Sequence, residues 1–131
     1  MGLIYVDACL LIYAFEDHPR HGARVRQRLA SAPPDSLAIS PLVQLECLVG
    51  PMKSGNLVLQ RYYEEGLRQL ASLPLPEAVF LQAARVRAQF GLRTPDAIHL
   101  AAAQHHRCAA LWTNDDRLAL AAHGLAMNVL Q

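Results

Sequence analysis

The stretch from Arg93 to Ala103 most constrains what this chain can fold into. Beyond Asp96 it consists of alanine, isoleucine, leucine and one histidine, so it predicts a helix that is buried on nearly all sides. Thr94 has the side chain of an N-cap and Pro95 suits the first helical position, which places the helix at about 95–106. Asp96 then stands in the first turn. There it either only stabilises the helix, through a favourable interaction with the helix dipole, or belongs to a functional site.

Short apolar runs alternate with helical segments along the rest of the chain. The strand candidates are Leu3–Val6, Leu37–Ile39, a minimal edge strand at Leu73–Leu75, Ala109–Trp112 and Leu125–Leu130. The helix candidates are Cys9–Phe15, His21–Ala30, Leu42–Val49 stopped by Gly50-Pro51, a helix capped by Asn56 and reaching Ser72, one opened by Pro76-Glu77 and ended by Gly91, and Asp116–His123 with Gly124 as its C-cap. The alternation predicts the α/β class: a three-layer α/β/α fold with a central, mostly parallel sheet of four to five strands. We expect residues 1–131 to form a single domain.

Several classes of protein are excluded by composition. No apolar stretch approaches the roughly 18 residues that cross a bilayer, and the N-terminus lacks the pattern of a signal peptide, so we expect a cytoplasmic protein with no membrane partner. Three scattered cysteines and six histidines form no disulfide framework or zinc pattern. A net charge of +1 is not that of a strong polyanion binder. Every cation except Lys53 is arginine, however, which either reflects genome composition or suits bidentate phosphate contacts.

Acidic side chains in apolar surroundings are the candidates for a site. Asp7 and Asp115 each follow a strand candidate, and ligands of such sheets bind beyond the carboxyl ends of the strands. Glu46 is the only charged side chain between Ser36 and Met52, so we expect it to face water, a cation or a proton-sharing partner. Simpler explanations stay open: Asp7 and Asp115 as turn or capping residues, and Glu46 on a solvent-facing helix edge. Asp115 is preferred over its neighbour Asp116, which remains a substitute.

Four converging carboxylates need a compensating positive charge. Either their affinity for protons rises or a cation enters, and a hard cation such as Mg²⁺ or Mn²⁺ prefers oxygen ligands. Paired metals roughly 4 Å apart, held by carboxylates, are suited to phosphodiester hydrolysis. The residues expected to bind metal and to catalyse are Asp7, Glu46, Asp96 and Asp115.

The order and spacing of these acids resemble the PIN-domain family. The resemblance rests on Asp7, Glu46, Thr94-Pro95-Asp96-Ala97 and Thr113-Asn114-Asp115, and it covers essentially the whole chain. The chain looks most similar to the small virulence-associated toxin ribonucleases of toxin–antitoxin pairs. This implies a metal-dependent endoribonuclease that cuts RNA, forms a homodimer and pairs with a small antitoxin, a segment of which covers the acidic cleft.

The resemblance also implies roles for single residues. Asp7, Asp96 and Asp115 would bind metal directly, whereas Glu46 would bind it directly or through water and help position the attacking water. Thr113 stands where the family often has a hydroxyl that supports the acids. Cys9 departs from the usual Asn or Ser, and its thiol would order the site less well.

Other interpretations remain open. A degenerate PIN fold would bind RNA or protein without turnover, although all four acids are present. A phospho-receiver signalling domain also gathers acids around Mg²⁺, but it needs a late lysine, and the only lysine here is Lys53 in mid-chain. His99 is either a core residue or a hydrogen-bonding neighbour of the site, and Arg93 either contacts phosphate or is solvated. Base stacking is conceivable for three aromatic residues whose positions favour core packing, namely Tyr62, Tyr63 and Trp112.

Overall fold

The computed structural model describes residues 2–122 and 124–130. Its centre is a sheet of five parallel strands in the order β3-β2-β1-β4-β5. The strands are β1 (Ile4–Val6), β2 (Leu37–Ile39), β3 (Ala71–Ser72), β4 (Ala110–Thr113) and β5 (Ala126–Asn128). The predicted α/β class, with a central and mostly parallel sheet of four to five strands, is therefore confirmed.

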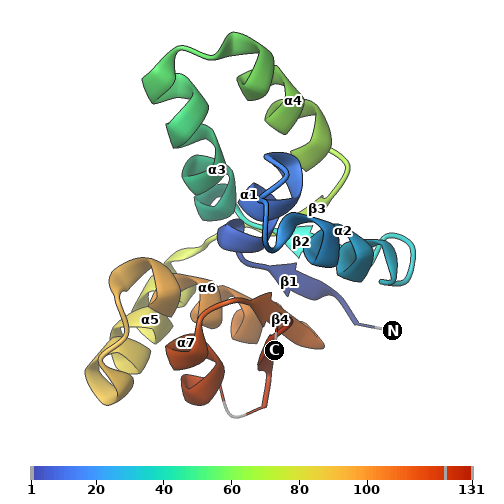
Figure 1. Ribbon diagram of the computed structural model, residues 1–131. Coiled ribbons are helices and arrows are strands. Elements are labelled where there is room, and N and C mark those ends of the chain that lie inside the picture. The colour runs from blue at the N-terminus through green and yellow to red at the C-terminus, as the bar shows by residue number, and fades with distance from the viewer. Residues whose placement is uncertain (1, 123, 131) are drawn as a thin grey trace.

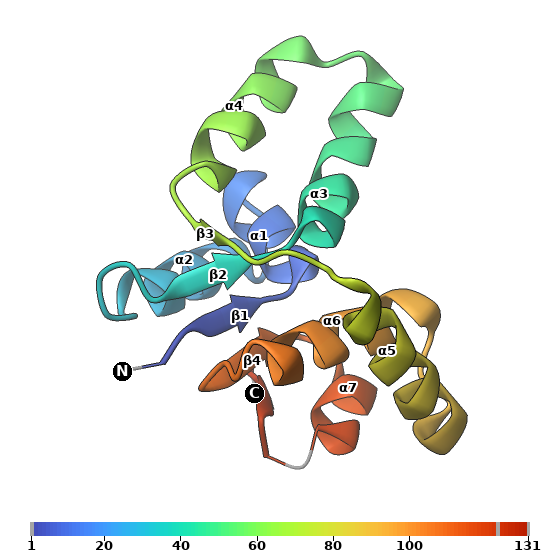
Figure 2. The same ribbon diagram turned by 180° about the vertical axis from the view of Figure 1, so that it is seen from behind.

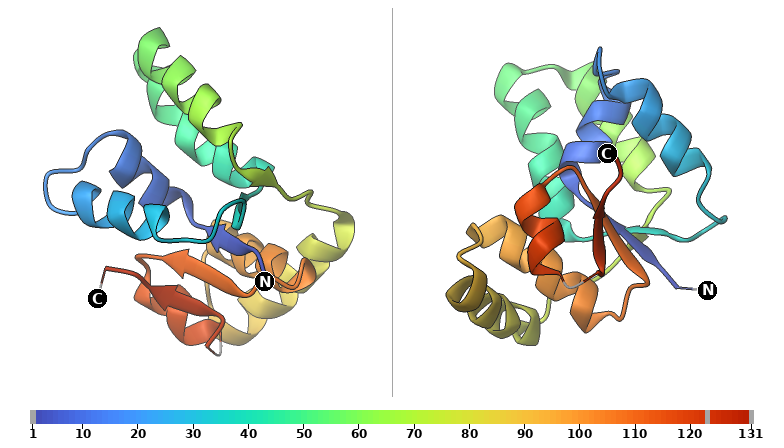
Figure 3. Two further views of the ribbon diagram at one scale, coloured as in Figure 1. Left: turned by 90° about the vertical axis from the view of Figure 1, so that its right-hand side faces the viewer. Right: turned by 60° about the horizontal axis from the view of Figure 1, so that its bottom comes forward.

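Helices cover both faces of this sheet, which makes three layers (Figures 1 and 3). One face carries α1 (Ala8–Phe15), α2 (Gly22–Ala30), α3 (Pro41–Ser54) and α4 (Leu57–Leu67). The other face carries α5 (Glu77–Phe90), α6 (Thr94–His105) and α7 (Asp116–Ala121). Helices α3 and α4 form a hairpin whose far end extends beyond the sheet (Figure 2).

Helix α6 is buried on nearly all sides, as its composition predicts. Each residue from Ala97 to Ala103 is at most 9% exposed, and the helix packs against α5, α7 and β4. Tyr5 on β1 and Leu111 on β4 are fully buried as well. The central strands thus form the apolar runs that are typical of a parallel sheet covered on both faces.

The predicted end of α3 was wrong. The helix does not stop at Gly50-Pro51 but runs through both residues to Ser54, and Gly55 ends it with a left-handed backbone (φ 70°). Proline removes one backbone hydrogen bond from a helix. Pro51 is buried, however, so its packing in the interior overrides the local signal.

The predicted edge strand was also misplaced. It lies at Ala71–Ser72, paired with Ala38 and Ile39 of β2, and not at Leu73–Leu75. The Leu73 N–H still donates to the Ile39 carbonyl oxygen at 2.8 Å, but Pro74 has no N–H with which to continue the ladder. Because the strand comes this early, α4 ends at Leu67 instead of Ser72, although Asn56 caps it as expected.

The other boundaries differ by a few residues. Thr94 is the first residue of α6 and not its N-cap, because the extended Arg93 takes that place and its carbonyl oxygen accepts from the Ala97 N–H at 3.0 Å. Helix α7 ends at Ala121, short of the expected His123, which lies outside the described residues. The last strand covers only 126–128. Among the described residues, no helix has the length and apolar character needed to cross a membrane.

Candidate metal centre

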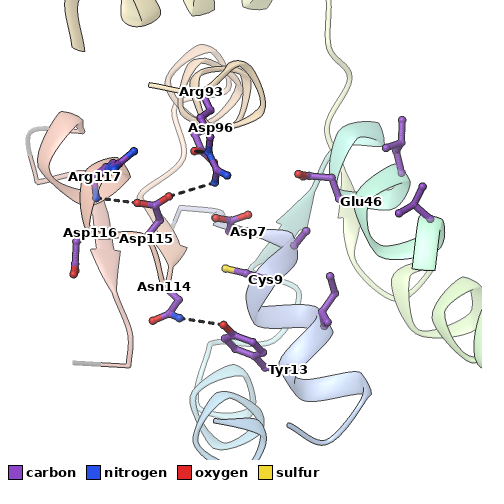
Figure 4. A pocket seen from close by; sticks show the side chains of 14 residues that line it. Asp7, Cys9, Tyr13, Glu46, Arg93, Asp96, Asn114, Asp115, Asp116 and Arg117 are labelled. Atoms are coloured by element: carbon purple, nitrogen blue, oxygen red, sulfur yellow. Dashed lines mark hydrogen bonds and ion pairs between the residues drawn. The ribbon is translucent and has the colours of Figure 1, made fainter. Parts of the chain in front are cut away.

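The carboxyl ends of β1 and β4 lie side by side because the two strands pair in parallel, with Val6 opposite Trp112. Asp7 directly follows β1, and its N–H donates to the Trp112 carbonyl oxygen at 2.9 Å. A cavity of about 750 Å³ opens at this edge of the sheet (Figure 4). Side chains from four elements or their ends line it, and they include Asp7, Glu46, Asp96 and Asp115.

Asp7 is held by β4 and not by its own helix. It occupies the N-cap position of α1, yet its side chain makes no capping hydrogen bond. Its Oδ2 instead accepts from Thr113 Oγ1 at 2.8 Å. The same Oγ1 accepts from the Asp115 N–H at 3.0 Å. One buried hydroxyl therefore fixes both acids at the ends of the two strands.

Asp115 has one carboxylate oxygen in a cap and the other near the cavity. Its Oδ1 accepts from the N–H groups of Arg117 and Leu118 at 2.9 and 3.3 Å, which caps α7. Its Oδ2 lies 3.9 Å from Arg93 Nη2. Asp116 points away from the other acids in Figure 4, and its Oδ1 accepts from Asn128 Nδ2 at 3.0 Å. Of the two neighbours, Asp115 faces the cluster.

Asp96 is a buried acid beside a cation. It is 8% exposed in the first turn of α6, and its Oδ2 accepts from Arg93 Nε at 3.1 Å. Burial raises the pKa of Asp96, and this effect outweighs the lowering by Arg93. The negative charges of Asp115 and Asp7 raise it further. Arg93, whose side chain is 74% exposed, thus lies between two acids of the cavity and supplies positive charge to both.

Glu46 reaches the cluster from α3, on the opposite side of the cavity (Figure 4). Its Oε1 lies 2.5 Å from His99 Nε2, and its side chain is 30% exposed. His99 is fully buried one turn after Asp96, and its Nδ1 lies 2.7 Å from the Tyr5 hydroxyl. His99 Nε2 also lies 3.9 Å from Asp7 Oδ1. His99 is therefore part of the acidic cluster as well as of the core.

The donor atoms present fit a divalent cation. One ligand atom each from Asp7, Glu46 and His99 lie within 4.8 Å of one another. Asp96 and Asp115 add carboxylates to the same cavity wall, and among the described residues the only arginine or lysine side chains that line it are Arg93 and Arg117. Carboxylate oxygens with at most one imidazole nitrogen suit Mg²⁺ or Mn²⁺ better than a thiolate-seeking metal.

The remaining candidates from the sequence lie at the margin of the cavity or outside it. Cys9 lines the wall beside Asp7 (Figure 4). Burial, followed by the charge of Asp7, raises the pKa of its thiol to about 12, so Cys9 is a neutral thiol at physiological pH. Tyr63 and Trp112 are buried in the core, as expected, whereas Tyr62 is 56% exposed on α4. Lys53 lies in the last turn of α3.

Three further residues, Ser40, Tyr5 and His99, are joined by hydrogen bonds to the acid Glu46. From the sequence, core packing is the better interpretation for His99 and a hydrogen bond near the site is the alternative. The pair Ser40-Pro41 indicates only the start of a helix, and Tyr5 is one residue of a strand candidate. Ser40 occupies the N-cap position of α3, but its hydroxyl makes no capping hydrogen bond to the helix backbone. It lies 2.7 Å from the Tyr5 hydroxyl instead. One signal was available: Asp96 and His99 are three residues apart, which places both on one face of a helix.

Comparisons with known proteins agree with this geometry. The family model of the PIN domain matches residues 4–124. A chain of a toxin–antitoxin complex from Klebsiella pneumoniae is 25% identical, with a TM-score of 0.81 over 96% of this chain and 97% of that one. FitAcB from Neisseria gonorrhoeae is 20% identical, with a TM-score of 0.77 over 98% and 99% of the two chains.

A third solved structure is VapC20 from Mycobacterium tuberculosis, described as a toxin that cleaves the sarcin–ricin loop. It is 14% identical, with a TM-score of 0.78 over 90% of this chain and 94% of that one. At this identity, the similarity concerns the fold. None of the curated proteins matches the sequence.

Proposed function

The chain belongs to the PIN domain family, and from this premise we propose that it is a metal-dependent endoribonuclease and the toxin of a toxin–antitoxin pair. The observation that carries the proposal is the shared cavity: Asp7, Glu46, Asp96 and Asp115 all line it, although they are scattered along the chain. Like charges gathered in this way are tolerated when a cation joins them. The similarity to a chain of a toxin–antitoxin complex supports the biological role.

Asp7, Asp96 and Asp115 would hold Mg²⁺ or Mn²⁺ through carboxylate oxygens, with Glu46 binding directly or through water. A bound ion of this kind polarises a phosphate oxygen and lowers the pKa of water. Whether one ion or two bind, the acids have to be pre-positioned. The Thr113 hydroxyl does this for Asp7 and for the backbone of Asp115.

The other residues of the cavity have separable tasks in the proposed hydrolysis. With Glu46 Oε1 close to His99, Oε2 is the oxygen left to accept a proton or hydrogen bond from the attacking water. Arg93 lies between Asp96 and Asp115, and its guanidinium would contact a phosphate of the RNA when these two carboxylates hold a cation. Arg117 stands on the same wall.

The proposal includes partners. The substrate is RNA, and a small antitoxin would cover the cavity. Leu45 and Val49 support an apolar contact there, since both line the cavity and are 58% and 57% exposed. Homodimerisation, a cytoplasmic location and the assignment of residues 1–131 to one nuclease domain stay predictions.

The test is RNA cleavage by the purified chain with Mg²⁺ or Mn²⁺. Asp7→Asn and Asp96→Asn each remove one ligand charge, and we expect either variant to lose at least about 100-fold in rate while folding normally. Asp35→Asn is the matched control, because Asp35 is an exposed loop residue with a left-handed backbone (φ 59°) that asparagine also adopts. Cleavage that survives both substitutions, or persists in excess chelator, would exclude the proposal.

The same assay distinguishes the proposed nuclease from the alternative, a PIN fold that binds RNA or protein without cleaving it. Tight RNA binding by the wild type, with no cleavage under either metal, would favour a binding module. Co-expression with the product of a short adjacent gene tests the antitoxin. A complex that blocks cleavage would support the toxin assignment.

A further inference from the structure

Four polar side chains are joined by consecutive hydrogen bonds that lead from the interior to the cavity. Ser40 Oγ lies 2.7 Å from the Tyr5 hydroxyl, which lies 2.7 Å from His99 Nδ1. His99 Nε2 lies 2.5 Å from Glu46 Oε1. Ser40, Tyr5 and His99 are all fully buried, so the chain crosses the interior from β1 and the N-cap of α3 through α6 to the cavity.

The hydrogen bonds of this chain have one consistent direction. An ionised Glu46 can only accept, so His99 Nε2 carries the hydrogen and donates to Oε1. Nδ1 then accepts from the Tyr5 hydroxyl, and burial raises the pKa of Tyr5, which keeps it a donor. The Tyr5 oxygen in turn accepts from the Ser40 hydroxyl. The hydroxyls of Ser40 and Tyr5 and the Nε2–H of His99 each donate one hydrogen bond, and Nδ1 of His99 accepts one. The Ser40 side chain is thus paired with Tyr5, which explains why it makes no capping hydrogen bond to the backbone of α3.

We propose that His99 is the positioning residue for Glu46, acting through the Nε2–Oε1 hydrogen bond and fixed in its own orientation by Tyr5. This rests on the proposed function of the cavity. Glu46 has a flexible side chain that is 30% exposed and lines the cavity, and without a partner it would sample several rotamers. The donated hydrogen bond holds one oxygen and leaves the other for the cation or its water.

The position of His99 also matters for charge. Its Nε2 lies 3.9 Å from Asp7 Oδ1 and 2.5 Å from Glu46 Oε1, so one N–H group stands between two acids of different elements. Groups that orient metal-binding side chains typically change metal affinity by about 10–100-fold when removed. His99 is therefore expected to affect metal binding without being a ligand.

The experiment measures the binding of Mn²⁺ alone, by electron paramagnetic resonance, to the wild type, His99→Leu, Glu46→Ala and the double variant. We expect His99→Leu to weaken Mn²⁺ binding about 10–100-fold. In the Glu46→Ala background, the same substitution should have almost no further effect, because alanine has no side-chain oxygen to accept the hydrogen bond from His99. An equal loss in both backgrounds would overturn the proposal, since His99 would then act independently of Glu46.

Two conservative variants guard against a purely structural effect. His99→Gln keeps an N–H donor near the Nε2 position and should recover most of the affinity. Tyr5→Phe removes only the hydroxyl and should weaken binding several-fold. Bound Mn²⁺ should show no directly coordinated nitrogen, because a nitrogen signal lost in His99→Leu would identify a ligand and refute positioning.

The outcomes distinguish this inference from the proposed function. Wild type that binds no Mn²⁺ would overturn both. If the wild type binds Mn²⁺, and folded His99→Leu and Tyr5→Phe bind it equally tightly, then only the role of His99 is refuted.

Discussion

Thr113 offers the sharpest test of how the site is held together, through the substitution Thr113→Val. Valine keeps the shape and the strand preference of threonine but removes the hydroxyl. That hydroxyl donates to Asp7 Oδ2 at 2.8 Å and accepts from the Asp115 N–H at 3.0 Å, in a residue that is fully buried. Its loss would leave the carboxylate of Asp7, a side chain that is only 10% exposed, without this donor.

The magnitude follows from the two bonds. A hydrogen bond to a charged group contributes about 1.5–3 kcal/mol and a neutral one about 0.5–1.5 kcal/mol. Thr113→Val should therefore lower the free energy of unfolding by about 2–4.5 kcal/mol. Thr113→Ser is the matched control, because it keeps the hydroxyl and loses one methyl group, at a cost of about 1 kcal/mol.

The assay is urea unfolding followed by the fluorescence of Trp112, the only tryptophan, which is 5% exposed and adjacent in sequence. Mn²⁺ titration of both variants is the second measurement, and the valine variant should bind more weakly than the serine variant. If Thr113→Val is as stable as Thr113→Ser and binds Mn²⁺ equally well, the hydroxyl does not position Asp7 as the structure indicates.

Three further predictions concern other parts of the site and the α3–α4 hairpin. Burial is the chief cause that raises the pKa of Asp96 in the folded protein, so the fold favours the protonated form of this side chain. The resulting stabilisation is fully present below the pKa of the unfolded state and is lost as the pH rises through the pKa of the folded state. Asp96→Asn should therefore stabilise the metal-free protein at neutral pH but not in acid, and an equal effect at both pH values in urea unfolding would contradict this. Arg93→Gln removes the positive charge that contacts both Asp96 and Asp115 and that competes with a cation for these carboxylates. Mn²⁺ should therefore bind about two- to fivefold more tightly at low salt in a calorimetric titration. Weaker binding would show that Arg93 does not compete with the cation. Tyr63→Phe deletes the donor to Glu16 Oε2 at 2.5 Å and should cost about 1.5–3 kcal/mol in urea unfolding, with Tyr62→Phe as the neutral control.

The layout of the fold could be predicted because it depends on local patterns. Apolar runs at strand length, a helix without a polar face, and Asn56 as a cap are all local properties of the sequence, and the strands and helices follow them. The two main errors had different causes. At Pro51, tertiary packing opposed a local signal, since this residue stays helical and is buried. At the edge strand, the local signal itself moves the pairing to Ala71–Ser72, because Pro74 lacks an N–H group with which to continue the ladder.

The sequence points to Asp7, Asp96 and Asp115 by their positions at the ends of strands and helices, and to Glu46 as the only charged side chain between Ser36 and Met52. The hydrogen-bond partner of each carboxylate oxygen in these acids, however, was decided only by the tertiary structure. The pairing of β1 with β4 joins segments about a hundred residues apart and brings Asp7 to Thr113. A local pattern cannot specify the neighbour of a strand, since the same apolar run can pair with any other.

His99 illustrates the same limit most clearly. By sequence it is one polar residue in an apolar helix, for which core packing is the better interpretation and a role near the site is the alternative. The packing of α6 beneath β1 and opposite α3 gives it Tyr5 on one nitrogen and Glu46 on the other. The residue types present were determined by the sequence, whereas the hydrogen bonds that give them a role exist only once three separate elements meet.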